Sequence, residues 1–211
     1  MGWSSWPISR FLSFCHAICC VVAAIKILGT LTSEILWDPG VIRYALWSDM
    51  FRVTYCYLAF DIIMMLLFPT KGDWQYITHH FFGGIGIWQF WYFQMGWLIG
   101  LIFELTEMST IFLNITWYLN KSMEETRSKG YVPDPATKVS FLIAGLMLLA
   151  SFFMTRIFGA GVIAYYIYDH HEFFLQMYWI QYYYLFGGCA IISGLNFYWF
   201  FKLLQKLMSQ F

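Results

Sequence analysis

Ionisable side chains occur inside apolar stretches of this sequence, at spacings that suit acid–base or nucleophilic chemistry. Asp61 lies four residues after Tyr57, His79 and His80 are adjacent, and Glu107 follows 27 residues after His80. A carboxylate beside a neutral imidazole orients the ring and makes it more basic, so that a histidine can act as a nucleophile or general base. We therefore take His79, His80, Glu107 and Asp61 as the candidate catalytic residues.

Further polar residues share helix faces with these candidates. The 100° step of a helix places four side chains within about 120° of arc: Glu104, Glu107, Thr110 and Asn114. Tyr57 and Asp61 share a face in the same way. Lipid offers no partner to a polar group, so these faces must turn toward the interior of a helix bundle. The predicted cavity lining comprises Tyr57, Glu104, Thr110, Asn114 and Asn196.

Each candidate also has a purely structural interpretation. The two histidines could bond neighbouring helices or lipid headgroups, and Glu104 and Glu107 could join helices through buried hydrogen bonds. A metal site is not expected, because adjacent histidines on a helix point about 100° apart and do not readily bind one ion. No cofactor is expected either.

The composition excludes a water-soluble fold. Of the 211 residues, 60% are hydrophobic and 11% are charged, whereas soluble domains carry roughly 25% charged residues. The formal net charge is zero, so the basic surface typical of nucleic-acid-binding proteins is missing. The sequence therefore predicts an integral membrane protein whose partners are membrane lipids and include no nucleic acid.

Six membrane spans are predicted, since a helix needs roughly 20 apolar residues to cross a hydrocarbon core of about 30 Å. They cover about 11–31, 50–68, 76–94, 97–119, 139–158 and 174–203. Residues 160–168 are interpreted as a continuation of the fifth span, broken at Gly159 and Gly161; a separate seventh span is the alternative. Residues 120–137 are expected to form the longest loop. The whole chain, 1–211, is predicted to be one all-α transmembrane domain.

The basic residues predict an orientation, because Lys and Arg in short loops favour the cytoplasmic side. With six spans, one side receives Arg10, Lys71, Lys121, Arg127, Lys129, Lys138, Lys202 and Lys206, and the other only Arg43, Arg52 and Arg156. Both termini are therefore expected in the cytoplasm or an equivalent compartment such as the mitochondrial matrix. From helix rise, His79, Asp61 and Glu107 lie roughly 5, 10 and 18 Å from that face, which predicts a cavity open to it.

The segments that carry these residues resemble the TLC family, which includes TRAM, Lag1 and CLN8 proteins. The resemblance covers about residues 45–205 and rests on four segments: Tyr57 to Asp61, His79-His80, Glu107 to Trp117, and Asn196 to Lys202. Their order and spacing are most similar to the TLC-domain-containing proteins outside the ceramide synthase branch. The resemblance implies a lipid-handling helix bundle in the endoplasmic reticulum or another endomembrane; the mitochondrial inner membrane is the alternative.

Departures from the family pattern separate two implied functions. Ceramide synthases carry a His-Asp pair and a second Asp where this chain has Thr106-Glu107 and Thr110. Because only one acid is kept, we expect a protein that holds an acyl chain or lipid and influences lipid homeostasis. The alternative is an acyltransferase in which acyl-CoA is a substrate, its phosphates received by the basic loops.

A third possibility is an accessory subunit without catalytic activity. Short loops and an aromatic content of 23% suit contacts with other membrane protein subunits in a larger complex. The sequence leaves these three functions open, and lipid binding is the one we favour.

Overall fold

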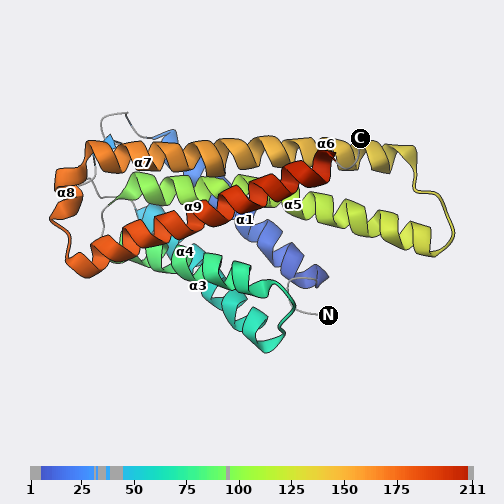
Figure 1. Cartoon of the computed structure of the whole chain (residues 1–211), viewed down its shortest axis with the longest axis horizontal. Coiled ribbons are helices and arrows are strands. Elements are labelled where there is room, and N and C mark those ends of the chain that lie inside the picture. The colour runs from blue at the N-terminus through green and yellow to red at the C-terminus, as the bar shows by residue number, and fades with distance from the viewer. Residues whose placement is uncertain (1–5, 31, 33–36, 39–44, 94–95, 209–211) are drawn as a thin grey trace.

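The structure is a computed structural model that describes residues 6–30, 32, 37–38, 45–93 and 96–208. Throughout this part the elements are helical, which confirms the predicted all-α bundle (Figure 1). The helices are α1 (Pro7–Leu28), α3 (Ala45–Leu67), α4 (Asp73–Phe93), α5 (Trp97–Ser128), α6 (Pro135–Phe152), α7 (Gly159–Asp169), α8 (His171–Leu175) and α9 (Trp179–Met208). A π-helical segment, η2 (Phe153–Phe158), joins α6 to α7. Arg43, counted above for the orientation, lies outside the described residues.

Local sequence explains several helix ends. Pro7 and Pro135 stand in the first turns of α1 and α6, where the missing N–H of proline would have no helical partner. The Asp134 carboxylate also accepts a hydrogen bond from the Thr137 backbone N–H at 3.3 Å. After α5, Gly130 adopts a left-handed φ of 81°, and the Tyr131 N–H bonds back to the Thr126 carbonyl at 3.1 Å. This arrangement ends α5 as a glycine C-cap.

α5 is the central helix of the bundle. It packs against α1 and α6, while α3 pairs with α4, and α4 also packs against α9. α1 begins and α9 ends at the same end of the molecule, and the α5–α6 hairpin projects beyond them there (Figure 1). We call this the open end, and the opposite one, where α7, α8 and the start of α5 meet, the closed end.

The closed end contains the hydrophobic core. Its buried side chains include large aromatic and aliphatic residues from four helices and α8: Phe51, Phe90, Trp97, Ile99, Leu101, Tyr166 and Phe174. The Phe51 ring stacks on Trp97 with centroids 5.1 Å apart. This packing fixes how α3, α4, α5 and α7 converge.

Five described helical segments are long and apolar enough to cross a membrane: Pro7–Leu28, Ser48–Leu67, Trp97–Ser128, Pro135–Asp169 and Trp179–Met208. The predicted span at 76–94 corresponds to α4. This helix has a similar length, but it does not reach the apolarity of the five segments. Its polar side chains include His79, His80 and Gln89. The protein is therefore an integral membrane protein in which α4, although long enough to span, contains no stretch as apolar as those of the other five segments.

Two sequence-based boundaries need correction. Pro135–Asp169 forms one 35-residue helical segment, so residues 160–168 continue the fifth span, but the irregularity is the π-helix before Gly159 rather than a break at Gly159 and Gly161. In addition, α5 runs to Ser128, so most of the predicted loop at 120–137 is helical. A 32-residue helix is about 48 Å long, so α5 exceeds the membrane core and its last turns leave it.

Candidate functional site

A cavity of about 310 Å³ opens at the end of the bundle where α1 begins and α9 ends. Its lining comes from α1, α3, α4, α5, α6, η2 and α9. Six of the nine predicted site residues lie in it: Tyr57, Asp61, His79, His80, Glu107 and Thr110. Residues from three separate stretches of sequence thus meet in one space, although their chemical roles remain predictions.

A histidine and a carboxylate form the closest polar pair in the cavity. His80 Nδ1 lies 3.1 Å from Asp61 Oδ2, an ion pair whenever the ring is protonated. Both side chains are about 15% exposed, so the pair is reached through the cavity. A carboxylate at this distance can orient the imidazole and stabilise its charged form.

Aromatic rings surround the two histidines. Tyr57 lies near the His80 ring, with centroids 6.3 Å apart, and His79 meets Trp199 edge-on at 5.3 Å. Trp199 is fixed in turn, because its indole N–H donates to Gln75 Oε1 at 3.1 Å. α4 and α9 are thereby joined at the cavity wall, which restrains His79.

Glu107 lies in the cavity without a partner of its own. It forms no hydrogen bond or ion pair within the described chain. Asn114 and Asn196, predicted as cavity lining, are instead fully or almost fully buried outside it. The Asn114 amide donates to Ser13 Oγ at 3.2 Å and to the Thr110 carbonyl at 3.0 Å. Asn114 therefore ties α5 to α1 behind the cavity.

Glu104, also predicted as cavity lining, belongs to a separate buried network. It is 1% exposed, and its Oε2 accepts a hydrogen bond from Thr54 Oγ1 at 2.9 Å. Cys20 Sγ lies 3.4 Å from Thr54 Oγ1 and 3.2 Å from His16 Nε2. We call these four residues the Glu104 network. The prediction of Glu104 as cavity lining is wrong because the side chain points between α1 and α3.

His16 was missed in the sequence. Its ring stacks on Tyr57, with centroids 4.0 Å apart, and so supports a cavity residue from behind. The sequence did contain a signal, because His16 is an ionisable residue within the first apolar stretch. An ionisable residue in a membrane span is a candidate functional residue.

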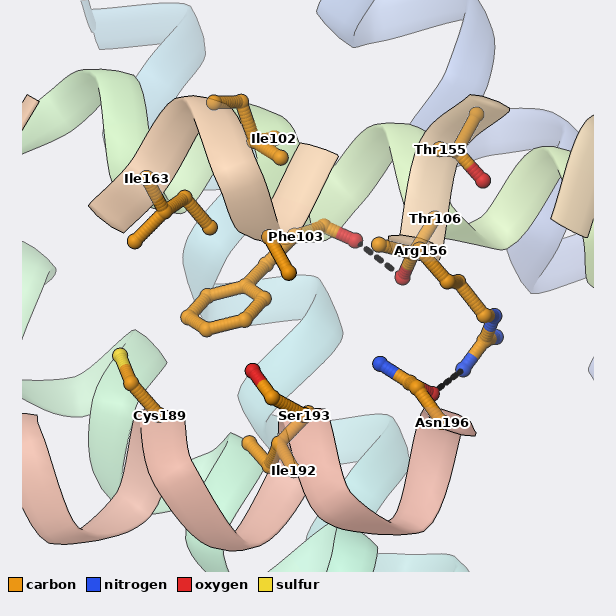
Figure 2. A pocket seen from close by; sticks show the side chains of 11 residues that line it. Ile102, Phe103, Thr106, Thr155, Arg156, Ile163, Cys189, Ile192, Ser193 and Asn196 are labelled. Carbon is orange, nitrogen blue, oxygen red and sulfur yellow. Dashed lines mark hydrogen bonds between the residues drawn. The ribbon is translucent and has the colours of Figure 1, made fainter. Parts of the chain in front are cut away.

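Arg156 is the second residue that sequence reasoning missed. At the end of the predicted fifth span, its charge is counted above on the outer side, but Arg156 lies in η2 and is 7% exposed. Its Nε donates to Ser109 Oγ at 2.8 Å, Nη1 to Asn196 Oδ1 at 3.2 Å, and Nη2 to Thr110 Oγ1 at 3.3 Å. Figure 2 shows the side chain reaching from η2 toward Asn196 on α9. Arg156 thus connects three helical segments and lines the cavity.

A small side pocket of about 20 Å³ adjoins Arg156 (Figure 2). Its walls are partly apolar, with Ile102, Phe103 and Ile163, and partly polar, with Asn196 at one side. A space of this size holds about one water molecule. The side pocket is therefore too small for an organic ligand, and the main cavity is the candidate site.

Comparison with known proteins identifies the family. The model of the TLC domain (TRAM, Lag1 and CLN8) matches residues 8–205. The chain belongs to the TLC domain family. The match begins at residue 8 rather than at about 45, and so includes α1 and every cavity-lining residue except Lys206. No curated protein and no solved structure matched this TLC chain.

Proposed function

We propose that this TLC chain holds an acyl chain or lipid in the open-end cavity and thereby influences membrane lipid composition. The observation that carries the proposal is a cavity with both polar and apolar walls inside a membrane-spanning bundle. The polar wall contains His79, His80 and Glu107, and the apolar wall contains Met65, Leu113, Leu148, Phe152 and Leu203. Such a combination suits an amphipathic ligand, since ligand sites are mostly apolar with a few placed polar groups.

The size of the cavity limits the ligand. Small-molecule sites typically measure about 300–1,000 Å³, and this cavity, at about 310 Å³, is at the low end. It suits a headgroup with part of one chain better than a complete lipid with two chains. Single-chain lipids are therefore the ligands to test first.

Lipid retention tests the proposal. The full chain, purified in mild detergent, is analysed by native mass spectrometry and by extraction of its lipids. We expect a stoichiometric lipid in the wild type and a loss of at least 80% in Leu113→Trp, because the larger side chain fills the cavity. Leu113 is 37% exposed, so a tryptophan there does not have to enter a packed core.

Leu146→Trp is the matched control. Leu146 is 48% exposed on the neighbouring helix α6 and does not line the cavity. This variant should keep its lipid. Equal retention by both variants, or a wild type without lipid, would contradict the proposal.

Acyl transfer from acyl-CoA is the second candidate, and the 3.1 Å contact between His80 and Asp61 favours it. A histidine oriented in this way could act as a general base: it would remove the proton of a lipid amine or hydroxyl while that group attacks the thioester carbonyl. The C–S bond then breaks, and the leaving CoA thiolate takes up a proton. With oleoyl-CoA as donor and sphingosine or monooleoylglycerol as acceptor, we expect the wild type to release free CoA. His80→Ala should lose this release. Absence of CoA release across chain lengths and acceptors would exclude this activity.

A further inference from the structure

Arg156 is a buried cation that forms no ion pair with any residue of the described chain. The residue as a whole is 7% exposed, and no Asp or Glu of the described chain lies within ion-pair distance of its guanidinium group. A charged side chain within a membrane span is costly and normally pairs or faces a cavity. Arg156 faces the cavity, and Glu107, which lines the same cavity, acts on its charge without forming an ion pair. A direct anionic partner for the guanidinium is therefore to be sought in the cavity.

The hydrogen bonds of Arg156 position the charge without neutralising it. All three acceptors are uncharged, namely Ser109, Thr110 and Asn196. A guanidinium group has five N–H donors in a fixed plane, so two remain after these three bonds. Even if a water in the side pocket takes one, no anion of the described chain contacts the guanidinium directly, and Glu107 acts on its charge only at longer range. Arginine presents its donors in a fork that matches the oxygens of carboxylates and phosphates.

The charges of the cavity as a whole also indicate an anionic ligand. Four basic residues line it, Arg10, Arg156, Lys202 and Lys206, against the two acids Asp61 and Glu107. The formal charge is thus +2 with neutral histidines. Asp61 is in contact with His80, and Glu107 makes no contact with Arg156 within ion-pair distance. The excess of positive charge favours an anionic ligand.

The π-helix places Arg156 at this point. A π-helical turn is rare and is frequently found at functional sites, and Arg156 lies within the six residues of η2. Its guanidinium also stands 5.1 Å from the centre of the Phe152 ring. The side chain is therefore held on one side by an aromatic face and on the other by three hydrogen bonds, a geometry fixed before any ligand enters.

We infer that the cavity selects single-chain lipids that carry an oxyanion, and that Arg156 binds this oxyanion. This inference rests on the proposed function and specifies the ligand class of the same site. The oxyanion has two possible sources, the carboxylate of a fatty acid or the phosphate of a lysophospholipid. Arg10, Lys202 and Lys206 lie nearer the mouth of the cavity and attract the anion before Arg156 binds it.

Matched ligand pairs test the inference. Oleate is compared with oleyl alcohol, and oleoyl lysophosphatidic acid with monooleoylglycerol, so that each pair shares a chain and differs in the anion. Binding to the full chain in detergent is measured by native mass spectrometry at pH 7.5. We expect the wild type to bind at least one anionic lipid at least tenfold more tightly than its neutral match, and the pair that shows this identifies the source.

Asn196→Asp is the decisive variant. Asn196 Oδ1 already accepts from Arg156 at 3.2 Å, so aspartate would supply a counter-charge with almost no change of shape. The anionic preference should fall at least tenfold while neutral lipids bind as before. Arg156→Gln should have the same effect, and Gln176→Glu, which adds the same charge at an exposed position just after α8, should have none.

The outcomes separate this inference from the proposed function. If the wild type binds neither member of either pair, the proposed function fails. If it binds each anionic lipid and its neutral match equally, or if Asn196→Asp keeps the tenfold preference, only the inference about Arg156 fails. A parallel loss of anionic and neutral lipids in both Asn196→Asp and Arg156→Gln would also overturn it, because that pattern indicates a structural role alone.

Discussion

The closed and open ends of the bundle are built from the same long helices but packed in different ways. At the closed end, Phe51, Ile99 and Leu101 have no exposed surface, and Phe90 has 2%. At the open end the same α3, α4 and α5 diverge around a cavity of about 310 Å³ that contains His79, His80 and Glu107. Apolar packing therefore holds the helices together at one end, which allows the other end to retain space and polar groups.

Truncating a leucine at each end should give the largest contrast. Leu101→Ala removes a fully buried side chain of the closed end, and the cost is about 2–5 kcal/mol. Leu203→Ala only widens the existing cavity, and we expect about 0.5 kcal/mol or less. At roughly 2–4 °C per kcal/mol for a chain of this size, thermal unfolding in detergent should distinguish them. Equal midpoints would contradict the difference in packing.

Replacing a glycine in the closed end should give a smaller loss of stability. A Cβ at Gly100 would lie 2.5 Å from Phe51 Cζ and 3.1 Å from Phe90 Cδ2, and both rings are held in the core. Gly100→Ala should therefore destabilise the protein by about 1–3 kcal/mol. Gly194→Ala is the control, since nothing lies within 4 Å of its Cβ position, and its midpoint should not fall. A tolerated Gly100→Ala would show that the closed end can expand.

The Glu104 network, between the two ends, should show the smallest effect. Thr54→Val removes the hydroxyl that donates to Glu104 at 2.9 Å and leaves a buried oxygen without that donor, at a cost of about 1–2 kcal/mol. Thr54→Ser keeps the hydroxyl and should recover most of the loss. The same unfolding measurement applies, and an identical midpoint for valine and serine would mean that the hydrogen bond contributes nothing.

Much of the fold could be predicted from sequence, because membrane spans depend on apolar length alone. The five apolar segments, the all-α class and the continuation of the fifth span past residue 160 follow from that rule. The helical part of 120–128 did not, because charged residues outside the membrane carry no hydropathy signal even when they extend a helix. α4 was predicted as a span of ordinary character, although its histidines already marked it as more polar.

The candidate site was partly predictable for a related reason. Asp61, His79, His80 and Glu107 could be grouped because each is ionisable within an apolar stretch, and the structure brings all four into one cavity. Arg156 was excluded because its place near the end of a predicted span made it resemble a loop residue. Glu104 was included because helical periodicity gives a shared face but not the neighbour that the face meets.

The π-helix has a consequence for how relatives of this protein should be compared. A π-helical segment such as η2 accommodates an extra residue within a helix, because its hydrogen bonds span five residues instead of four. A relative that lacked one residue here would present the aligned arginine about 100° away around the helix axis, and so away from Asn196. Insertions and deletions within Phe153–Phe158 are therefore as informative as the identity of residue 156 itself.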